Sequence, residues 1–255
     1  MSTRRPRGEV VYAASGVSKH YGPITACDSV DLEIRAGEIL AVVGDNGAGK
    51  TTLVKILTGA ITADEGQLVR DGRPITLHST MDAHRHGIEV VYQELALAPN
   101  LDVVSNVFLG REKYWTPGFL PFPRILRRRT MAELARTELQ RLNVSIPAVV
   151  GTPVGRMSGG QRQSVAIARS VFWASDILFM DEPTAALGVK ESQAVLQLVR
   201  KVADDGVAVV MVSHAMPHVV ELADRVVVMR HGRKVEDRPS GDLDVQQLVS
   251  MIVGA

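Results

Sequence analysis

Apolar and polar residues follow two patterns along this chain, and their alternation predicts an α/β fold. Runs made almost only of apolar residues, typical of strands buried on both faces, lie at residues 39–43, 177–180, 207–212 and 225–229. A shorter strand is expected at residues 88–92. Apolar residues at helical spacing follow residue 159 and recur over residues 190–203 and 216–222. We therefore expect a mainly parallel core sheet with helices on both faces.

Two regions depart from this alternation. Val30, Leu32 and Ile34 alternate with charged residues, so residues 9–35 predict an N-terminal antiparallel β subdomain. Residues 95–155 carry apolar side chains at helical spacing, which predicts a helical subdomain inserted into the core.

These regions predict one domain over residues 1–255. We expect the α/β core at about residues 8–94 and 156–240, the helical subdomain at about residues 95–155, and a C-terminal helix at residues 241–255. No run approaches the ~18–20 apolar residues of a membrane span, and the N-terminus lacks the apolar stretch of a signal peptide. The expectation is a protein that is soluble, or held at a membrane only by partners.

Charge and cysteine content exclude some classes of protein. Lys and Arg number 29 against 28 Asp and Glu, a net charge of +1, which argues against nucleic-acid binding driven by overall charge. The single cysteine, Cys27, cannot form an internal disulfide, as is usual for a reducing cytosol. We expect it to be a small buried apolar residue.

The stretch GDNGAGKTT follows the strand at residues 39–43 and precedes apolar residues at helical spacing. It matches the pattern G-x-x-x-x-G-K-[ST] in the strand–loop–helix context that this motif requires. Its glycines let successive N–H groups point at phosphate oxygens, and the helix N-terminus adds its positive dipole end. Lys50 is expected to reach the β- and γ-phosphates and Thr51 to bind Mg²⁺. The predicted nucleoside-triphosphate site comprises Gly44, Asp45, Asn46, Gly47, Ala48, Gly49, Lys50, Thr51 and Thr52.

Polar residues also follow other predicted strands. Asp181 and Glu182 end the strand at residues 177–180, and His214 follows the strand at residues 207–212. Because open parallel sheets bind ligands at the carboxyl ends of their strands, we expect these side chains to converge on the phosphates. Asp181 would hold Mg²⁺, Glu182 would activate the attacking water as a general base, and His214 would contact the γ-phosphate.

A second anion-binding helix terminus is predicted at MSGGQ. Ser158 is a suitable N-cap, and Gly159 and Gly160 leave the amides before Gln161 uncovered. One nucleotide does not need two such termini within one chain. The second terminus therefore predicts binding to a nucleotide held by another copy.

Together, GDNGAGKTT, MSGGQRQ, ILFMDEPT, the glutamine of VYQEL and VSHAM resemble the ATP-binding-cassette ATPases over nearly the whole chain. The resemblance implies a head-to-tail dimer in which ATP and Mg²⁺ lie between one copy's phosphate loop and the other copy's signature. The implied signature contacts are Ser158, Gly159, Gly160 and Gln161. It also implies that Tyr21 stacks on adenine, that Gln93 contacts Mg²⁺ or water in catalysis, and that Glu182 and His214 complete hydrolysis.

Two positions depart from the family pattern. Met157 stands where leucine is usual, a volume-conserving change. Gly188 stands where the loop after DEPT usually ends in aspartate, which predicts weaker communication between the two sites of a dimer.

The stretches DEPTAALGVKES and VSHAMPHV are most similar to the ATPases of bacterial importers for simple sugars of the ribose, xylose and fructose type. This implies a cytoplasmic subunit, peripheral on the inner face of the membrane, that binds integral-membrane permease subunits. Its other partners would be a second copy or a paralogous ATPase and, indirectly, a sugar-binding protein. Three alternatives stay open: another cargo (amino acid, lipid or drug), a soluble cassette protein acting on ribosomes or DNA, and a non-hydrolytic regulatory binder. The absence of a tandem cassette and of coiled-coil heptads in this sequence argues against the second, and intact Lys50, Asp181, Glu182 and His214 against the third.

Overall fold

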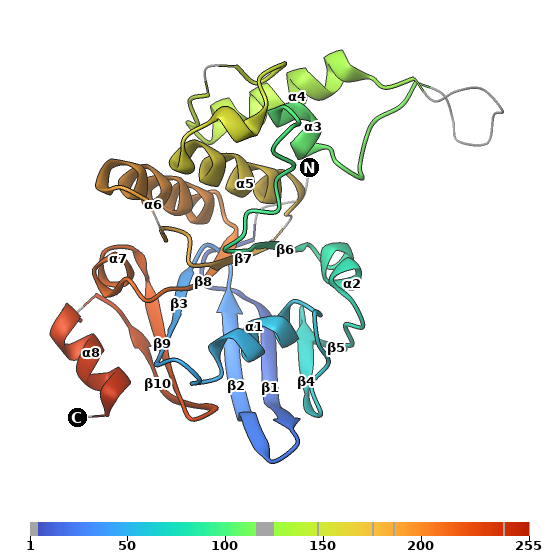
Figure 1. Ribbon diagram of the computed structural model, residues 1–255. Coiled ribbons are helices and arrows are strands. Elements are labelled where there is room, and N and C mark those ends of the chain that lie inside the picture. The colour runs from blue at the N-terminus through green and yellow to red at the C-terminus, as the bar shows by residue number, and fades with distance from the viewer. Residues whose placement is uncertain are drawn as a thin grey trace.

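The computed structural model describes residues 5–115, 125–146, 148–174, 176–185, 187–241 and 243–254. Its strands form two sheets (Figure 1). The smaller sheet contains β1 (Val10–Tyr21), β2 (Ile24–Arg35), β4 (Glu65–Arg70) and β5 (Arg73–Ile75), antiparallel in the order β2-β1-β4-β5. The larger sheet contains β3 (Ile39–Val43), β6 (Ile88–Val91), β7 (Ile177–Asp181), β8 (Ala208–Val212), β9 (Arg225–Arg230) and β10 (Arg233–Pro239).

The larger sheet has the order β10-β9-β3-β8-β7-β6. All of its neighbouring strands pair in parallel except β10, which is antiparallel to β9. This arrangement confirms the predicted α/β fold with a mainly parallel core sheet and an N-terminal antiparallel sheet.

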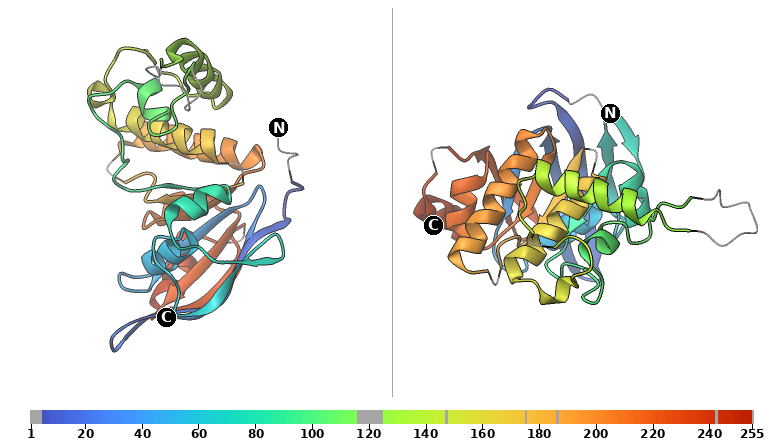
Figure 2. Two further views of the ribbon diagram at one scale, coloured as in Figure 1. Left: turned by 90° about the vertical axis from the view of Figure 1, so that its right-hand side faces the viewer. Right: turned by 90° about the horizontal axis from the view of Figure 1, so that it is seen from above.

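Helices cover both faces of the larger sheet (Figures 1 and 2). The described helices are α1 (Lys50–Leu57), α2 (Thr80–Arg85), α3 (Val103–Val107), α4 (Arg128–Arg141), α5 (Gly159–Trp173), α6 (Val189–Asp204), α7 (Met216–Leu222) and α8 (Val245–Val253), with a 3-10 turn at Val154–Arg156. Of these, α3 and α4 pack on α5, away from the sheet. Within the described parts of the chain, none of these helices has the length and hydropathy needed to cross a bilayer.

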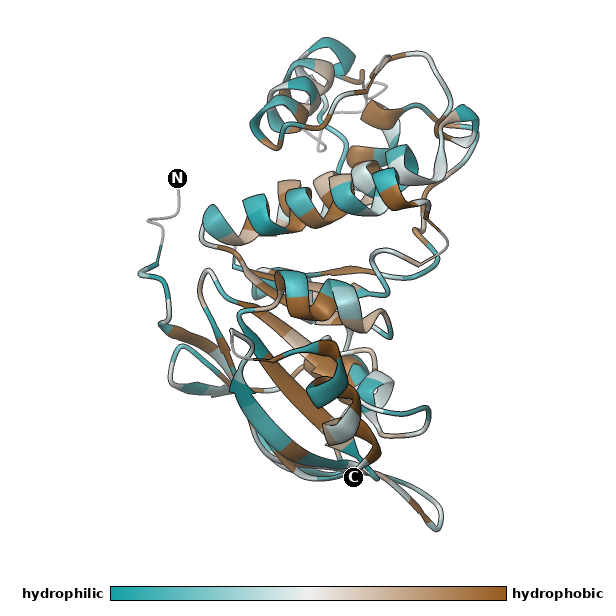
Figure 3. Ribbon diagram, turned by 90° about the vertical axis from the view of Figure 1, so that its left-hand side faces the viewer, coloured by the Kyte–Doolittle hydropathy of each residue, from teal (hydrophilic) through white to brown (hydrophobic). Residues whose placement is uncertain are grey.

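The larger sheet separates two hydrophobic cores, and alternate residues of one strand serve each. In β3, Ile39, Ala41 and Val43 pack with α3 to α8, whereas Leu40 and Val42 pack with α1 and the smaller sheet. All five residues are buried, which explains the continuous apolar run in the sequence. The hydropathy colouring shows these strands as a hydrophobic band, whereas the helices mix hydrophobic and hydrophilic residues (Figure 3).

The region after β6 packs on α5 through aromatic side chains. Phe108, Phe172 and Trp173 meet edge to face, with ring centroids 4.8–5.7 Å apart. The Trp173 indole N–H also donates to the Val107 carbonyl at 2.8 Å. These contacts fix α3 against the helix that begins at the MSGGQ motif.

Candidate nucleotide-binding site

The site is built where three neighbouring strands end. β7, β8 and β3 lie side by side and in parallel, so their carboxyl ends share one edge of the sheet. Asp181 is the last residue of β7, His214 follows β8, and Gly44 follows β3. The fold therefore brings polar groups from distant parts of the sequence to one edge, as open parallel sheets do at their binding sites.

At two positions of the phosphate loop, the backbone conformation and the close packing allow only glycine. Gly44 and Gly49 have φ values of 148° and 99°, which side chains with a Cβ rarely adopt. A Cβ at Gly44 would lie 2.2 Å from the Met229 carbonyl oxygen, and one at Gly49 would lie 2.2 Å from the Ala26 carbonyl oxygen. Tight packing against these two carbonyls sets the loop's curvature.

Lys50 begins α1 and spans the loop from the inside. Its ammonium group donates to the carbonyls of Gly44 and Asp45, at 2.7 and 2.8 Å. Burial lowers the pKa of Lys50, an effect that the carboxylates of Glu182, Asp45 and Asp181 oppose. A buried cation at the start of a helix is suited to bind phosphate.

One cavity of about 590 Å³ lies against the loop. It collects predicted residues from five separate segments of the sequence: Tyr21, Asn46, Gly47, Ala48, Gly49, Lys50, Thr51, Thr52, Gln93, Asp181, Glu182 and His214. Gly44 and Asp45 do not line it; their carbonyls receive the Lys50 ammonium instead. Tyr21 is 49% exposed at its mouth, which leaves the ring face accessible to a flat ligand.

Glu182 is held in an unusual environment. Its φ of +50° lies in the left-handed region, and its N–H donates to the Val212 carbonyl at 2.9 Å. The carboxylate atom Oε1 is buried without a hydrogen-bond partner, and His214 Nε2 lies 3.7 Å from it. Burial raises the pKa of Glu182, and the neighbouring Asp181 charge adds to this effect, whereas His214 opposes it.

The residues at this edge fit Mg²⁺ bound together with a nucleotide. Asp181, Thr51 and Gln93 line the same cavity and offer one carboxylate, one hydroxyl and one amide oxygen. The described residues contain no group of three or more His, Cys, Asp or Glu side chains placed to hold a metal by themselves. Mg²⁺ is commonly bound through one or two carboxylates, water and substrate phosphates, so this donor set is suitable.

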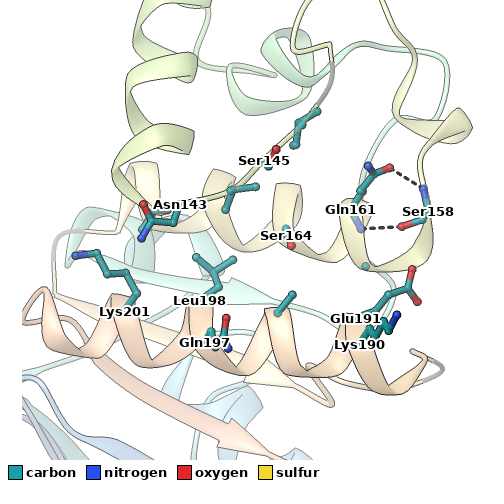
Figure 4. A pocket seen from close by; sticks show the side chains of 15 residues that line it. Asn143, Ser145, Ser158, Gln161, Ser164, Lys190, Glu191, Gln197, Leu198 and Lys201 are labelled. Carbon is teal, nitrogen blue, oxygen red and sulfur yellow. Dashed lines mark hydrogen bonds between the residues drawn. The ribbon is translucent and has the colours of Figure 1, made fainter.

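The predicted second terminus is the start of α5. Ser158 and Gln161 form a capping box: the Gln161 N–H donates to Ser158 Oγ at 3.3 Å, and the Ser158 N–H donates to Gln161 Oε1 at 3.0 Å. Ser158, Gly160 and Gln161 line a different cavity, of about 400 Å³, between α5 and α6 (Figure 4). The structure thus does not bring the signature and the phosphate loop of one chain together.

The expectation that the amides at this terminus are uncovered is wrong for Gly160. The Glu191 side chain points from α6 toward the first turn of α5 (Figure 4). Hydrogen bonds from the Ser158 hydroxyl, and then from the N–H groups of Gly188 and Gly160, lower the pKa of Glu191. In the sequence, Gly188-x-x-Glu191 resembles a capping box at the start of α6. This pattern predicts that Glu191 caps α6, but it does not predict the contact of Glu191 with α5.

Sequence reasoning also missed Arg169 of α5. Its guanidinium donates to the carbonyls of Ala96 and Leu95, at 2.7 and 3.1 Å, in the segment that follows Gln93. Ala96 has a φ of +48°, so this segment adopts a conformation that needs such support. No local sequence pattern could reveal this contact, because Ala96 and Leu95 lie 73 and 74 positions before Arg169 in the chain.

Comparison with known proteins places these features in one family. Residues 27–185 match the family described as ABC transporter. The fructose import ATP-binding protein FrcA of Rhizobium meliloti is 45% identical over 97% of this chain and 95% of its own length. The xylose/arabinose import ATP-binding protein XylG of Sulfolobus acidocaldarius is 38% identical over 92% of this chain and 91% of its own length.

The ribose import ATP-binding protein RbsA of Rhodopirellula baltica is 38% identical over 96% of this chain, which spans only 47% of that relative. Among solved structures, a nucleotide-free ATP-binding cassette from an ABC transporter superposes with a TM-score of 0.78 at 21% identity, covering 96% of both chains. A dimeric bacterial ABC transporter cassette superposes with a TM-score of 0.73 at 24% identity, covering 91% of this chain and 100% of that one. At such identities the superpositions report on the fold alone.

Proposed function

The chain belongs to the ABC transporter family, and from this premise we propose that it is the ATP-hydrolysing subunit of an importer for a simple sugar. Three relatives support the cargo class, since their names assign them to the import of fructose, xylose or arabinose, and ribose. The ATPase itself does not select the cargo. Selection would lie with a permease and a sugar-binding protein.

One observation carries the proposal that two chains act together. The phosphate loop lines one cavity and the signature residues line another, and none of the described residues lining the loop's cavity comes from α5. Each chain therefore carries both halves of a nucleotide site, the phosphate loop and the signature, but in separate places. A head-to-tail pair would place Ser158–Gln161 of one copy over the nucleotide of the other and complete two sites.

In this proposal the chain's own residues divide the chemistry of hydrolysis. Lys50 binds the β- and γ-phosphates, and Tyr21 stacks on the adenine. Glu182 accepts the proton of the attacking water, a role suited to a carboxylate whose pKa burial has raised. His214 lies 3.7 Å from Glu182 and contacts the γ-phosphate, while Gln93 positions the water.

Thr51, Gln93 and Asp181 would hold Mg²⁺, whose charge would offset that of the phosphates. Burial raises the pKa of Asp181, and the neighbouring His214 and Lys50 oppose this effect. A carboxylate that is costly to ionise where it stands is suited to pair with a divalent cation.

The docking face for the permease is proposed on the helical subdomain at about residues 95–155. This subdomain presents exposed apolar side chains at Leu109, Trp115, Ile125 and Leu126, which a partner could cover. The Arg127 guanidinium stacks 4.5 Å from the Trp115 ring centroid and orders part of this surface. The rest of the proposed organisation is a core at about residues 8–94 and 156–240 and a C-terminal segment at 241–255 that contains α8.

The dimer is tested with Glu182→Gln, which keeps the shape of the side chain but removes its basicity. With ATP and Mg²⁺ this variant should elute as a dimer in size-exclusion chromatography, whereas with ADP it should elute as a monomer. A variant that stays monomeric and hydrolyses ATP at the parent rate would contradict the mechanism.

The transport role is tested by membrane association. Co-expressed with a permease of the simple-sugar import class, the chain should copurify with membranes, and sugar uptake should depend on ATP. Replacing Trp115 and Leu126 with serine should release the chain from the membrane and leave its solution ATPase unchanged. Membrane binding that survives these substitutions would contradict the proposed docking face, and ATP-independent uptake would contradict the role.

A further inference from the structure

The first turn of α5, which the proposed function assigns to a nucleotide on a second copy, already contacts a carboxylate of its own chain. We propose that Glu191 is an internal stand-in for the γ-phosphate. It occupies the signature until a nucleoside triphosphate on the partner copy displaces it. This inference rests on the proposed head-to-tail dimer and adds a control on its closure.

The contacts of Glu191 involve the groups that a phosphate would use. Ser158 Oγ accepts the Gln161 N–H at 3.3 Å, which leaves the hydroxyl proton free for donation. The Glu191 side chain packs against Gly160, and interactions with the Ser158 hydroxyl and the Gly160 N–H lower the pKa of its carboxylate. Hydroxyl and N–H donors at a helix N-terminus bind carboxylate and phosphate by the same physics.

The fit at Gly160 is close. A Cβ built on Gly160 would lie 2.8, 3.0 and 3.3 Å from the Cβ, Cγ and Cδ atoms of Glu191, so this side chain lies directly on the helix backbone. A phosphate that approaches this part of the helix backbone would meet the Glu191 side chain. Like charges at this distance also repel, so Glu191 must turn away before the two copies close.

Glu191 has somewhere to go. Its Oε2 also accepts the Gly188 N–H at 3.3 Å, at the start of α6. A carboxylate that leaves Ser158 and Gly160 can keep this partner and face the cavity between α5 and α6 (Figure 4). The exchange therefore needs a side-chain rotation and no unfolding of either helix.

A simpler role, capping of α6 alone, makes a different prediction. Glu191→Gln keeps an oxygen that can accept the N–H groups of Gly188 and Gly160, so the cap survives. Only the negative charge that competes with the γ-phosphate is lost. Capping alone predicts no change in nucleotide-driven dimer formation, whereas displacement predicts easier closure.

The experiment uses the full chain with Glu182→Gln as the parent, so that ATP is not consumed. Dimer fraction is measured by analytical ultracentrifugation against ATP concentration with Mg²⁺, in the parent and in Glu182→Gln/Glu191→Gln. The half-maximal ATP concentration should fall about two- to fivefold in the double variant, the size of one charge effect at a helix terminus. Glu133→Gln on α4, which changes net charge equally at an exposed position, is the matched control and should behave as the parent does.

Salt gives a second readout that a purely structural role would not change. Raising the ionic strength should bring the half-maximal ATP concentrations of the parent and the double variant closer together, because the competition between Glu191 and the γ-phosphate is electrostatic. A parent that forms dimers with the same ATP dependence as the double variant overturns the role of Glu191 and leaves the dimer intact. A parent that stays monomeric at every ATP concentration overturns the proposed function itself, and the inference with it.

Discussion

Glu182→Gln should make the nucleotide-free chain more stable while abolishing its activity. The carboxylate is buried beside Asp181, its Oε1 atom has no hydrogen-bond partner, and its backbone is in the left-handed region. Leaving a buried polar group unsatisfied costs about 1–3 kcal/mol. The amide keeps polar atoms at the same place and so removes only part of this cost, which gives an expected gain of about 1 kcal/mol in the free energy of unfolding.

The dependence on pH follows from the direction of the shift. The pKa of Glu182 is raised in the folded chain above its ordinary value of 4.5, so the folded state binds the proton more tightly than the unfolded state. Above the folded pKa the carboxylate is charged in both states and its destabilisation is complete. As the pH falls through the folded pKa toward 4.5, this destabilisation is lost. The advantage of the variant should therefore be greatest near neutral pH and shrink on acidification.

Urea denaturation followed by circular dichroism, without nucleotide, measures both effects at pH 7.5 and near pH 5. Glu133→Gln is the control, since an exposed substitution should change stability by less than about 0.5 kcal/mol. A variant no more stable than the parent at neutral pH, or an advantage that grows on acidification, would refute the reasoning. In either case the buried carboxylate would not carry the cost assigned to it.

Three further substitutions test other contacts. Gly49→Ala should lower the free energy of unfolding by about 1–3 kcal/mol and abolish ATP binding in calorimetry, because its Cβ would clash with the Ala26 carbonyl. Gly47→Ala is the control: its Cβ would meet no atom within 4 Å, so the loss in the free energy of unfolding should be smaller. Arg169→Lys keeps the charge but loses the planar fork that reaches both carbonyls, so kcat should fall about two- to tenfold with KM for ATP unchanged. A KM effect alone would count against a positioning role. Gly188→Asp should raise the Hill coefficient of ATP hydrolysis, since its φ of −69° accepts aspartate; unchanged cooperativity would contradict the weaker site communication predicted for this chain.

Strands could be predicted from the sequence where both of their faces are buried, or where buried and exposed residues alternate strictly. The runs that became β3, β7, β8 and β9 are buried along nearly their whole length, so apolar residues mark them without interruption. β10 was missed because it is an edge strand, and its residues Arg233–Pro239 are nearly all exposed and mostly charged. α2 was missed because only Ala83 of its six residues is buried, which leaves no apolar period to detect.

The candidate site divides in the same way between local and tertiary information. The phosphate loop, Asp181 and His214 could be predicted because each follows its own strand, and parallel strands end at one edge. Glu191 and Arg169 could not be assigned their contacts, since these depend on how α5 packs against α6 and against the segment after β6. Composition and periodicity carry no record of such packing.

Glu182 and Glu191, on opposite halves of the proposed site, set the order of steps in the proposed cycle. Glu182 belongs to the face that binds nucleotide, and Glu191 belongs to the face that receives it from a second copy. Nucleotide must bind first beside Lys50, because only a γ-phosphate held there can exchange with Glu191 at Ser158 and Gly160. Hydrolysis removes that phosphate, and Glu191 can then return to the same donors. In the proposed dimer, this internal anion would favour separation of the two copies after hydrolysis and not before it, in addition to any action of the permease.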